Sequence, residues 1–121
     1  MAAYRQSLGR WGEDVAAEYL SRQGYTLIER NLRTPYGEID IVAQKDALLV
    51  FVEVKTRATQ RYGLPETAIT PHKQQHIIAA AQAYLQTNPH PGFDWRIDVI
   101  AIQKLPHFDE PEIVHFKNAI A

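Results

Sequence analysis

The chain of 121 residues contains no cysteine and no long hydrophobic run. Without cysteine there is no disulfide framework, so the default expectation is a reducing compartment and a cytoplasmic location. No apolar stretch approaches the roughly 20 residues that cross a bilayer. The first residues also lack the apolar segment of a signal peptide. We therefore expect no association with a membrane.

An excess of positive charge is missing as well. Thirteen Lys and Arg residues stand against fourteen Asp and Glu residues, and the formal net charge is −1. A tight nonspecific nucleic-acid binder is usually basic, so this balance argues mildly against that function. If the acids Glu13, Glu38, Asp40 and Glu53 gather at one site, however, the remaining charge of residues 1–75 is positive. The sequence thus permits a basic rim around an acidic site.

What is present is typical of a globular protein, with 45% hydrophobic and 22% charged residues. We expect a single domain over residues 1–121. Hydrophobic periodicity predicts helices and strands in the order helix, three strands, helix, two strands. Their ranges are 4–23, 25–32, 38–44, 48–56, 70–86, 95–102 and 113–118. This order indicates an α/β fold with a mixed central sheet.

The second and third predicted strands carry the acidic residues of interest. If the turn between them is the two-residue loop Asp46-Ala47, or widens by one residue on each side, the antiparallel register is fixed. Asp40 then lies opposite Glu53, and Glu38 lies opposite Lys55. A slip of one residue would send the charges of the two strands to opposite faces of the sheet.

This register predicts a metal site. Two carboxylates about 5 Å apart at the Cβ atoms repel each other unless a positive charge lies between them. Oxygen ligands favour Mg²⁺ or Mn²⁺ over zinc. Lys55, on the same face as Glu53, is placed to orient a water or to stabilise charge on a phosphate. Glu38 is either a supporting acid or the ion-pair partner of Lys55. The arrangement suits hydrolysis of a phosphodiester.

Asp40 followed by Glu53-Val54-Lys55 resembles the PD-(D/E)xK nuclease signature. The whole chain is similar to the YraN-like family of small bacterial proteins, whose fold resembles that of the Holliday-junction resolvases. The resemblance extends over roughly residues 8–118 and is carried by residues 9–13, 37–40, 52–57, 68–71 and 96–99. It implies a restriction-endonuclease-like fold and a metal-dependent endonuclease acting on DNA, with branched or flapped DNA as the analogous substrate.

Glu13 has two interpretations. From the residues alone it is a surface acid of the first helix, on the border of the buried stripe. The resemblance implies instead that it is an additional acid of the metal site beside Asp40 and Glu53. Gly9 and Gly12 are unusual within a helix, and they would let a strand or a phosphate come close.

Several residues are candidates for contact with DNA. The segment 70–86 begins with Thr70 as N-cap and Pro71, and free amides at such a helix start favour an anion. Its histidines are expected on the surface rather than as metal ligands. Each candidate also has a plain alternative as a packed loop residue or a solvated surface residue. The candidates are Arg33, Tyr36, Arg57, Arg61, Lys73 and Gln74.

Asp98 is expected to have a structural partner. It lies within an apolar strand, where an unpaired carboxylate is costly, and Arg96 is the nearest basic residue on the same face. We therefore predict an ion pair rather than a catalytic role.

Two further functions remain open beside the nuclease. One is a nucleic-acid-binding or interaction module with a weak or vestigial active site; the other is action through a protein partner without nucleic acid. A homodimer would let two sites address two strands of a junction, although no interface is evident from the residues.

Overall fold

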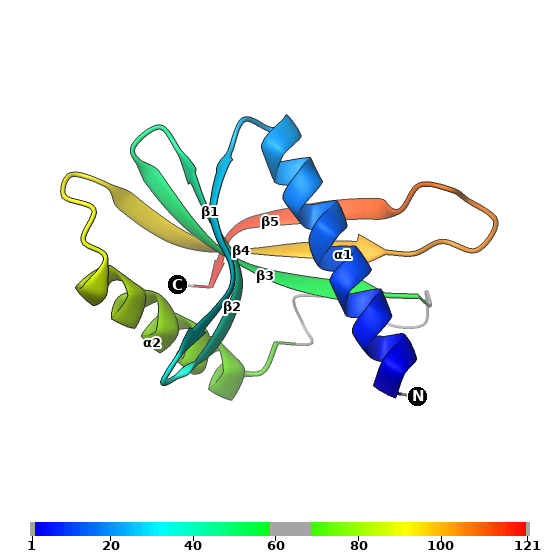
Figure 1. The fold of residues 1–121 in the computed structure, drawn as a ribbon, viewed down its shortest axis with the longest axis horizontal. Coiled ribbons are helices and arrows are strands. Elements are labelled where there is room, and N and C mark those ends of the chain that lie inside the picture. The colour runs from blue at the N-terminus through cyan, green and yellow to red at the C-terminus, as the bar shows by residue number, and fades with distance from the viewer. Residues whose placement is uncertain (1, 59–68, 121) are drawn as a thin grey trace.

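Five strands form one sheet that lies between two helices (Figure 1). The computed structural model describes residues 2–58 and 69–120. In chain order the elements are α1 (Ala2–Arg22), β1 (Thr26–Thr34), β2 (Gly37–Lys45), β3 (Leu48–Arg57), α2 (Pro71–Thr87), β4 (Asp94–Gln103) and β5 (Glu112–Ile120). This is the predicted order of helices and strands, and it confirms the α/β class.

The helix ends follow from local chemistry. Thr70 has extended backbone angles, and its hydroxyl oxygen accepts a hydrogen bond from the backbone N–H of Lys73 at 3.1 Å. Pro71 follows at the first helical position, where its missing N–H costs nothing. Gly24 adopts a φ of 93°, which lets the chain leave α1 in a left-handed conformation. The predicted N-cap is confirmed.

The sheet is mixed, with the strand order β1-β2-β3-β4-β5. Neighbouring strands are antiparallel except β3 and β4, which run parallel. A parallel pair needs a crossover connection, and α2 lies within it. Among the described residues, neither helix is both long and apolar enough to span a membrane.

The hairpin of β2 and β3 has the predicted register. Its pairs run from Lys45↔Leu48 at the turn to Ile41↔Val52. The turn is the two-residue loop Asp46-Ala47, in which Asp46 has a φ of 53°. No residue is skipped from Lys45 to Ile41, so the predicted register is confirmed for this part of the hairpin.

Each face of the sheet buries its own core. The core under α1 includes Ala16 and Leu20 with strand residues Ile41, Ala43, Val50, Val52, Ile100 and Ile102. The core under α2 includes Ile77, Ala81 and Tyr84 with strand residues Ile39, Val42, Phe51, Ile97 and Val99. The predicted alternation of β4 is thereby confirmed.

In β2 the side chains do not alternate regularly between the two faces of the sheet. Strict alternation would place Ile39 on the face of Ile41, but Ile39 packs in the core under α2. The regular pairs with β3 stop at Ile41, and the side chain of Asp40 instead accepts the backbone N–H of Val54. The strand therefore loses its strict two-residue period at the point where the acidic residues begin.

Gly12 allows α1 to come close to the end of β3. A Cβ atom on Gly12 would lie 1.9 Å from Oγ1 and 2.8 Å from Cβ of Thr56, so only glycine fits. Gly9, one turn earlier, has no such neighbour, since a Cβ there would meet nothing within 4 Å. The close approach expected from the two glycines is confirmed at Gly12 alone.

The two glycines predict opposite effects of alanine. Gly12→Ala should lower the free energy of unfolding by about 1–3 kcal/mol, because helix and strand must move apart. Gly9→Ala should raise it by up to about 1 kcal/mol, because alanine is the better helix former and has space there. Urea denaturation of the two variants measures both. Equal shifts in the same direction would contradict the close packing of α1 on Thr56.

Candidate active site

Two carboxylates from adjacent strands meet where β2 and β3 part. Asp40 Oδ2 accepts a hydrogen bond from the backbone N–H of Val54 at 2.8 Å. The side chain of Glu53 is 8% exposed. Burial, and next the negative charge of Glu53, raise the pKa of Asp40 to about 7. The structure therefore brings these two predicted residues into strong electrostatic contact.

Two lysines compensate the acidic pair. Nζ of Lys73, from the first turn of α2, lies 2.9 Å from Oε1 of Glu53, and Nζ of Lys55 lies 3.9 Å from the same atom. Burial, followed by the neighbouring Lys73, lowers the pKa of Lys55. Although burial opposes it, the hydrogen bond to Glu53 raises the pKa of Lys73. Lys73, expected from the sequence as a phosphate contact, thus lies at the centre of the site.

Glu13 reaches the site from α1. Together with Gly9, Val54, Lys55 and other residues it lines an open cavity of about 420 Å³. Burial raises the pKa of Glu13, and the charges of Glu38 and Glu53 add to the shift, whereas Arg30 opposes it. Glu13 is therefore close enough to interact electrostatically with Asp40 and Glu53, because Gly12 allows α1 to pack against the end of β3.

The donor set fits a hard divalent cation. Within residues 2–58 and 69–120, no three His, Cys, Asp or Glu side chains lie together as a ready metal cage. Asp40 and Glu53 remain as a pair of oxygen donors. Mg²⁺ keeps several waters and is often held by only one or two carboxylates, so the pair suffices for it. A buried acid with a raised pKa beside a second acid gains from such a charge.

Glu38, the predicted supporting acid, and the candidates Arg33 and Tyr36 contact residues other than Lys55 and Lys73. Nε of Arg33 lies 3.7 Å from Oε1 of Glu38, and both side chains are exposed. Glu38 thus pairs with Arg33 in the described structure, and not with Lys55 as one of the two interpretations had it. Tyr36 is 52% exposed at the turn between β1 and β2, and its carbonyl oxygen lies 2.8 Å from Nδ1 of His76.

The other candidates for DNA contact have different surroundings. Arg57 ends β3, and its carbonyl oxygen accepts the backbone N–H of Lys104 at 2.7 Å. The side-chain amide of Gln74 donates to the carbonyl oxygen of Ile69 at 3.0 Å, which ties it to the start of its own helix. Arg61 lies outside the described residues.

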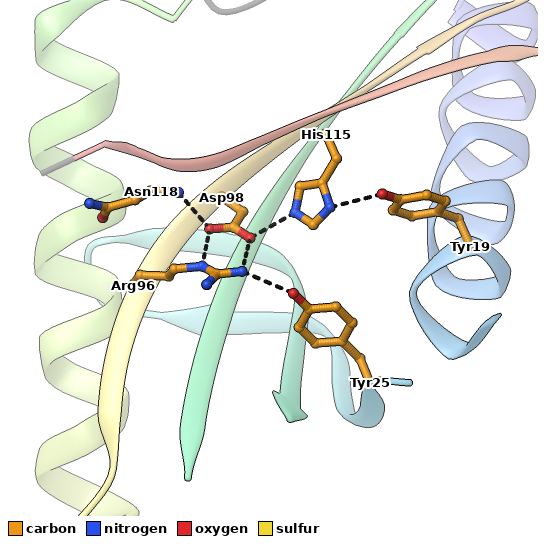
Figure 2. Close-up of polar contacts among 6 residues, drawn as sticks. All are labelled: Tyr19, Tyr25, Arg96, Asp98, His115 and Asn118. Carbon is orange, nitrogen blue, oxygen red and sulfur yellow. Dashed lines mark hydrogen bonds and ion pairs between the residues drawn. The ribbon is translucent and has the colours of Figure 1, made fainter. Parts of the chain in front are cut away.

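A second polar network is buried around Asp98 (Figure 2). The guanidinium of Arg96 donates to both carboxylate oxygens, at 2.8 and 3.1 Å. Nε2 of His115 lies 2.7 Å from Oδ2, and the backbone N–H of Asn118 donates to Oδ1 at 2.9 Å. Although burial opposes it, hydrogen bonds from His115 and Arg96 lower the pKa of Asp98. The predicted pair with Arg96 is confirmed.

The network also ties α1 to the sheet. The hydroxyl of Tyr19 lies 3.1 Å from Nδ1 of His115, and Arg96 donates to the hydroxyl oxygen of Tyr25 at 2.9 Å (Figure 2). Sequence reasoning placed Tyr19 in the buried stripe of its helix but missed His115. The position of His115 in the predicted last strand was the available signal, because alternate residues of a strand point to the same face of the sheet.

The Asp98 network predicts acid sensitivity. The pKa of Asp98 is depressed in the folded state, so its stabilisation is present above the unfolded pKa of about 3.9 and is lost as the pH falls through the folded value. Asp98→Asn should cost about 3 kcal/mol at pH 7, because Arg96 loses its counter-charge. The control Asp94→Asn, exposed on the same strand, should change stability by under about 0.5 kcal/mol. Urea denaturation from neutral to acid pH tests this, and equal effects would contradict it.

Asp40 predicts the opposite behaviour without metal. Its folded pKa of about 7 lies above the unfolded value of about 3.9, so the stability of the fold is highest below the unfolded value and falls as the pH rises from there to about 7. In the presence of a chelator, Asp40→Asn should raise the free energy of unfolding at pH 8 by more than about 1 kcal/mol and have little effect at pH 4. Asp46→Asn, in the exposed turn, is the control. A less stable Asp40→Asn variant at pH 8 would refute the repulsion.

Comparison with known proteins identifies the family. The model of the family described as "Uncharacterised protein family UPF0102" matches residues 12–102, which include every residue of the acidic site. A UPF0102 protein of Syntrophotalea carbinolica is 49% identical over 119 residues, covering 98% of this chain and 95% of its own. Another, from Dehalococcoides mccartyi, is 42% identical over 120 residues, covering 99% and 98%. A third, from Geobacter sulfurreducens, is 49% identical over 116 residues, covering 96% and 90%. The chain therefore belongs to the UPF0102 (YraN) family.

Proposed function

We propose that this protein is a metal-dependent endonuclease that hydrolyses phosphodiester bonds of DNA, built on a restriction-endonuclease-like fold. The observation that carries the proposal is the half-buried Asp40 beside the buried Glu53, with Lys55 two residues farther along β3. A pKa raised this far by burial and a neighbouring acid is characteristic of functional sites. The mixed sheet with α2 in the crossover supports the fold assignment.

Asp40 and Glu53 would hold Mg²⁺ or Mn²⁺, with Glu13 as a third acid on α1. When bound there, such an ion supplies Lewis acidity toward a phosphate oxygen and lowers the pKa of the attacking water. The backbone N–H of Val54 keeps the Asp40 carboxylate oriented. Glu38 supports the site through its charge, which acts on Glu13.

The lysines would act on the phosphate and on the proton. Lys55 has a lowered pKa, and a lysine of this kind exchanges protons more readily near neutral pH than an exposed one. Lys73 keeps its charge because it contacts Glu53. A positive charge at this place stabilises the negative charge that develops on phosphate during hydrolysis.

The rim of the site suits a nucleic-acid backbone. Arg33 and Tyr36 project at the turn between β1 and β2, and Arg57 lies at the end of β3. The exposed side chains of Arg33 and Tyr36 and the positive charges of Arg33 and Arg57 support DNA as the substrate. Preference for branched or flapped DNA, and a homodimer that presents two sites, rest on the resemblance to resolvases.

A second candidate function is a nucleic-acid-binding module with a weak or vestigial site. The ion pair of Lys73 with Glu53 favours it, because a lysine already neutralises one acid without a metal. The net charge of −1 adds no strong electrostatic attraction to DNA.

A cleavage assay separates the two functions. Wild-type protein with Mn²⁺ or Mg²⁺ should nick plasmid, flap or four-way-junction DNA. Asp40→Asn and Glu53→Gln should each reduce the rate at least about 100-fold, because each removes a ligand of the ion that would supply Lewis acidity to the phosphate. The control Asp46→Asn has the same net charge as these two variants and should retain the wild-type rate. Metal-dependent calorimetry on the same variants reports binding separately.

The contrary outcome is equally clear. If the wild type cleaves none of these substrates with either metal, and still shifts DNA in a salt-dependent manner, the protein is a binding module. If it neither cleaves nor shifts DNA, action through a protein partner replaces both proposals.

A further inference from the structure

The first turns of α2 carry a histidine pair that the acidic site does not use. His72 and His76 are four residues apart and therefore lie on one face of the helix. Their ring centroids are 4.4 Å apart, with the ring planes at 60°. Both residues are exposed. This spacing on a helix is the one by which two histidines bind a single metal ion in HExxH sites.

A hydrogen bond fixes which nitrogen of His76 is free. Nδ1 of His76 lies 2.8 Å from the carbonyl oxygen of Tyr36. A carbonyl oxygen can only accept, so Nδ1 must carry the proton. In a neutral ring Nε2 is then the unprotonated nitrogen that can bind a metal. Histidines that bind metal commonly donate their other N–H to a backbone carbonyl in this way, because the bond holds the ring in place.

We propose that His72 and His76 form a second metal site, for a borderline transition cation such as Zn²⁺, Ni²⁺ or Co²⁺. Imidazole suits these ions, whereas the carboxylates of Asp40 and Glu53 suit hard ions. The two sites are thus chemically distinct. The expected surface placement of both histidines is confirmed. The ring contact and the bond to Tyr36 are the observations that support a ligand pair.

The site is open rather than closed. In the part of the chain that the structure describes, no third His, Cys, Asp or Glu joins the pair. The remaining positions of the ion fall to water or to an incoming donor such as a phosphate oxygen. Sites of this open kind are typical of catalytic or binding metals rather than structural ones.

A cation held by this pair would reinforce the contact of two elements. His76 already joins α2 to the turn between β1 and β2 through the carbonyl oxygen of Tyr36. The ion would fix the ring that makes this contact and would add positive charge at the first turns of α2. Because it binds the folded state, it should also stabilise the protein.

Calorimetric titration with Zn²⁺ tests the proposal. His72→Gln and His76→Gln should each weaken one Zn²⁺ site at least about tenfold, because a single imidazole remains. His90→Gln is the matched control, since Nδ1 of His90 also lies 2.8 Å from a backbone carbonyl, that of Asn88, but no histidine lies four residues away. Asp40→Asn should retain this Zn²⁺ site, which separates it from the acidic pair.

Nuclear magnetic resonance of the wild type gives an answer that does not depend on variants. Zn²⁺ should shift the imidazole ¹⁵N signals of His72 and His76 before those of the other histidines, and it should raise the melting temperature of the wild type but not of His72→Gln. The proposal is overturned if all histidine signals respond alike, or if Zn²⁺ binding is lost in Asp40→Asn and kept in His72→Gln. Either result leaves the proposed nuclease function unaffected.

Discussion

The burial of the Asp40 carboxylate beside the negative charge of Glu53 is the constraint on which the site depends. Loss of water around Asp40, and next its repulsion from Glu53, destabilise the fold, and both appear as the raised pKa of Asp40. The protein offsets the cost locally, through the backbone N–H of Val54 on one acid and the ammonium of Lys73 on the other. A fold selected for stability alone would not keep this arrangement, because apolar residues of similar volume would stabilise it better.

Three separate elements are needed to build the site, and each is held by its own contact. The two-residue turn sets the register of β2 and β3 as far as Ile41 and Val52, and Asp40 and Glu53 come next on their strands, close enough to interact electrostatically. Gly12 lets α1 approach Thr56, which brings Glu13 within electrostatic reach. The capped start of α2 places Lys73 on Glu53. The Asp98 network fixes α1 to β4 and β5, on the opposite face of the sheet from α2. This contact helps to keep Glu13 of α1 in place relative to the acids on the strands.

The sequence predicts the contacts that depend on nearby residues. The register follows from a short turn between two apolar strands, and the pair of Arg96 with Asp98 follows from two residues on one face of one strand. It does not predict contacts that need tertiary packing. Lys73 meets Glu53 only because α2 crosses back over the sheet, and His115 meets Asp98 through the pairing of β4 with β5. The position of Ile39 was also not predictable from the sequence. The backbone N–H of Val54 binds the side chain of Asp40, and the regular alternation of β2 is lost beside it.

The position of Lys73 also relates the acidic site to an anionic substrate. A phosphate would not enter a pocket of uncompensated carboxylates, yet two lysines already lie within 4 Å of Oε1 of Glu53. If Glu53 binds a cation, that cation competes with Lys73 for the same oxygen. The ammonium of Lys73 then loses its partner and becomes available to the phosphate. Under the proposed function, the same lysine would stabilise the acids before metal and substrate arrive and would bind the substrate afterwards. A chain with a net charge of −1 would in this way present positive charge at the site itself.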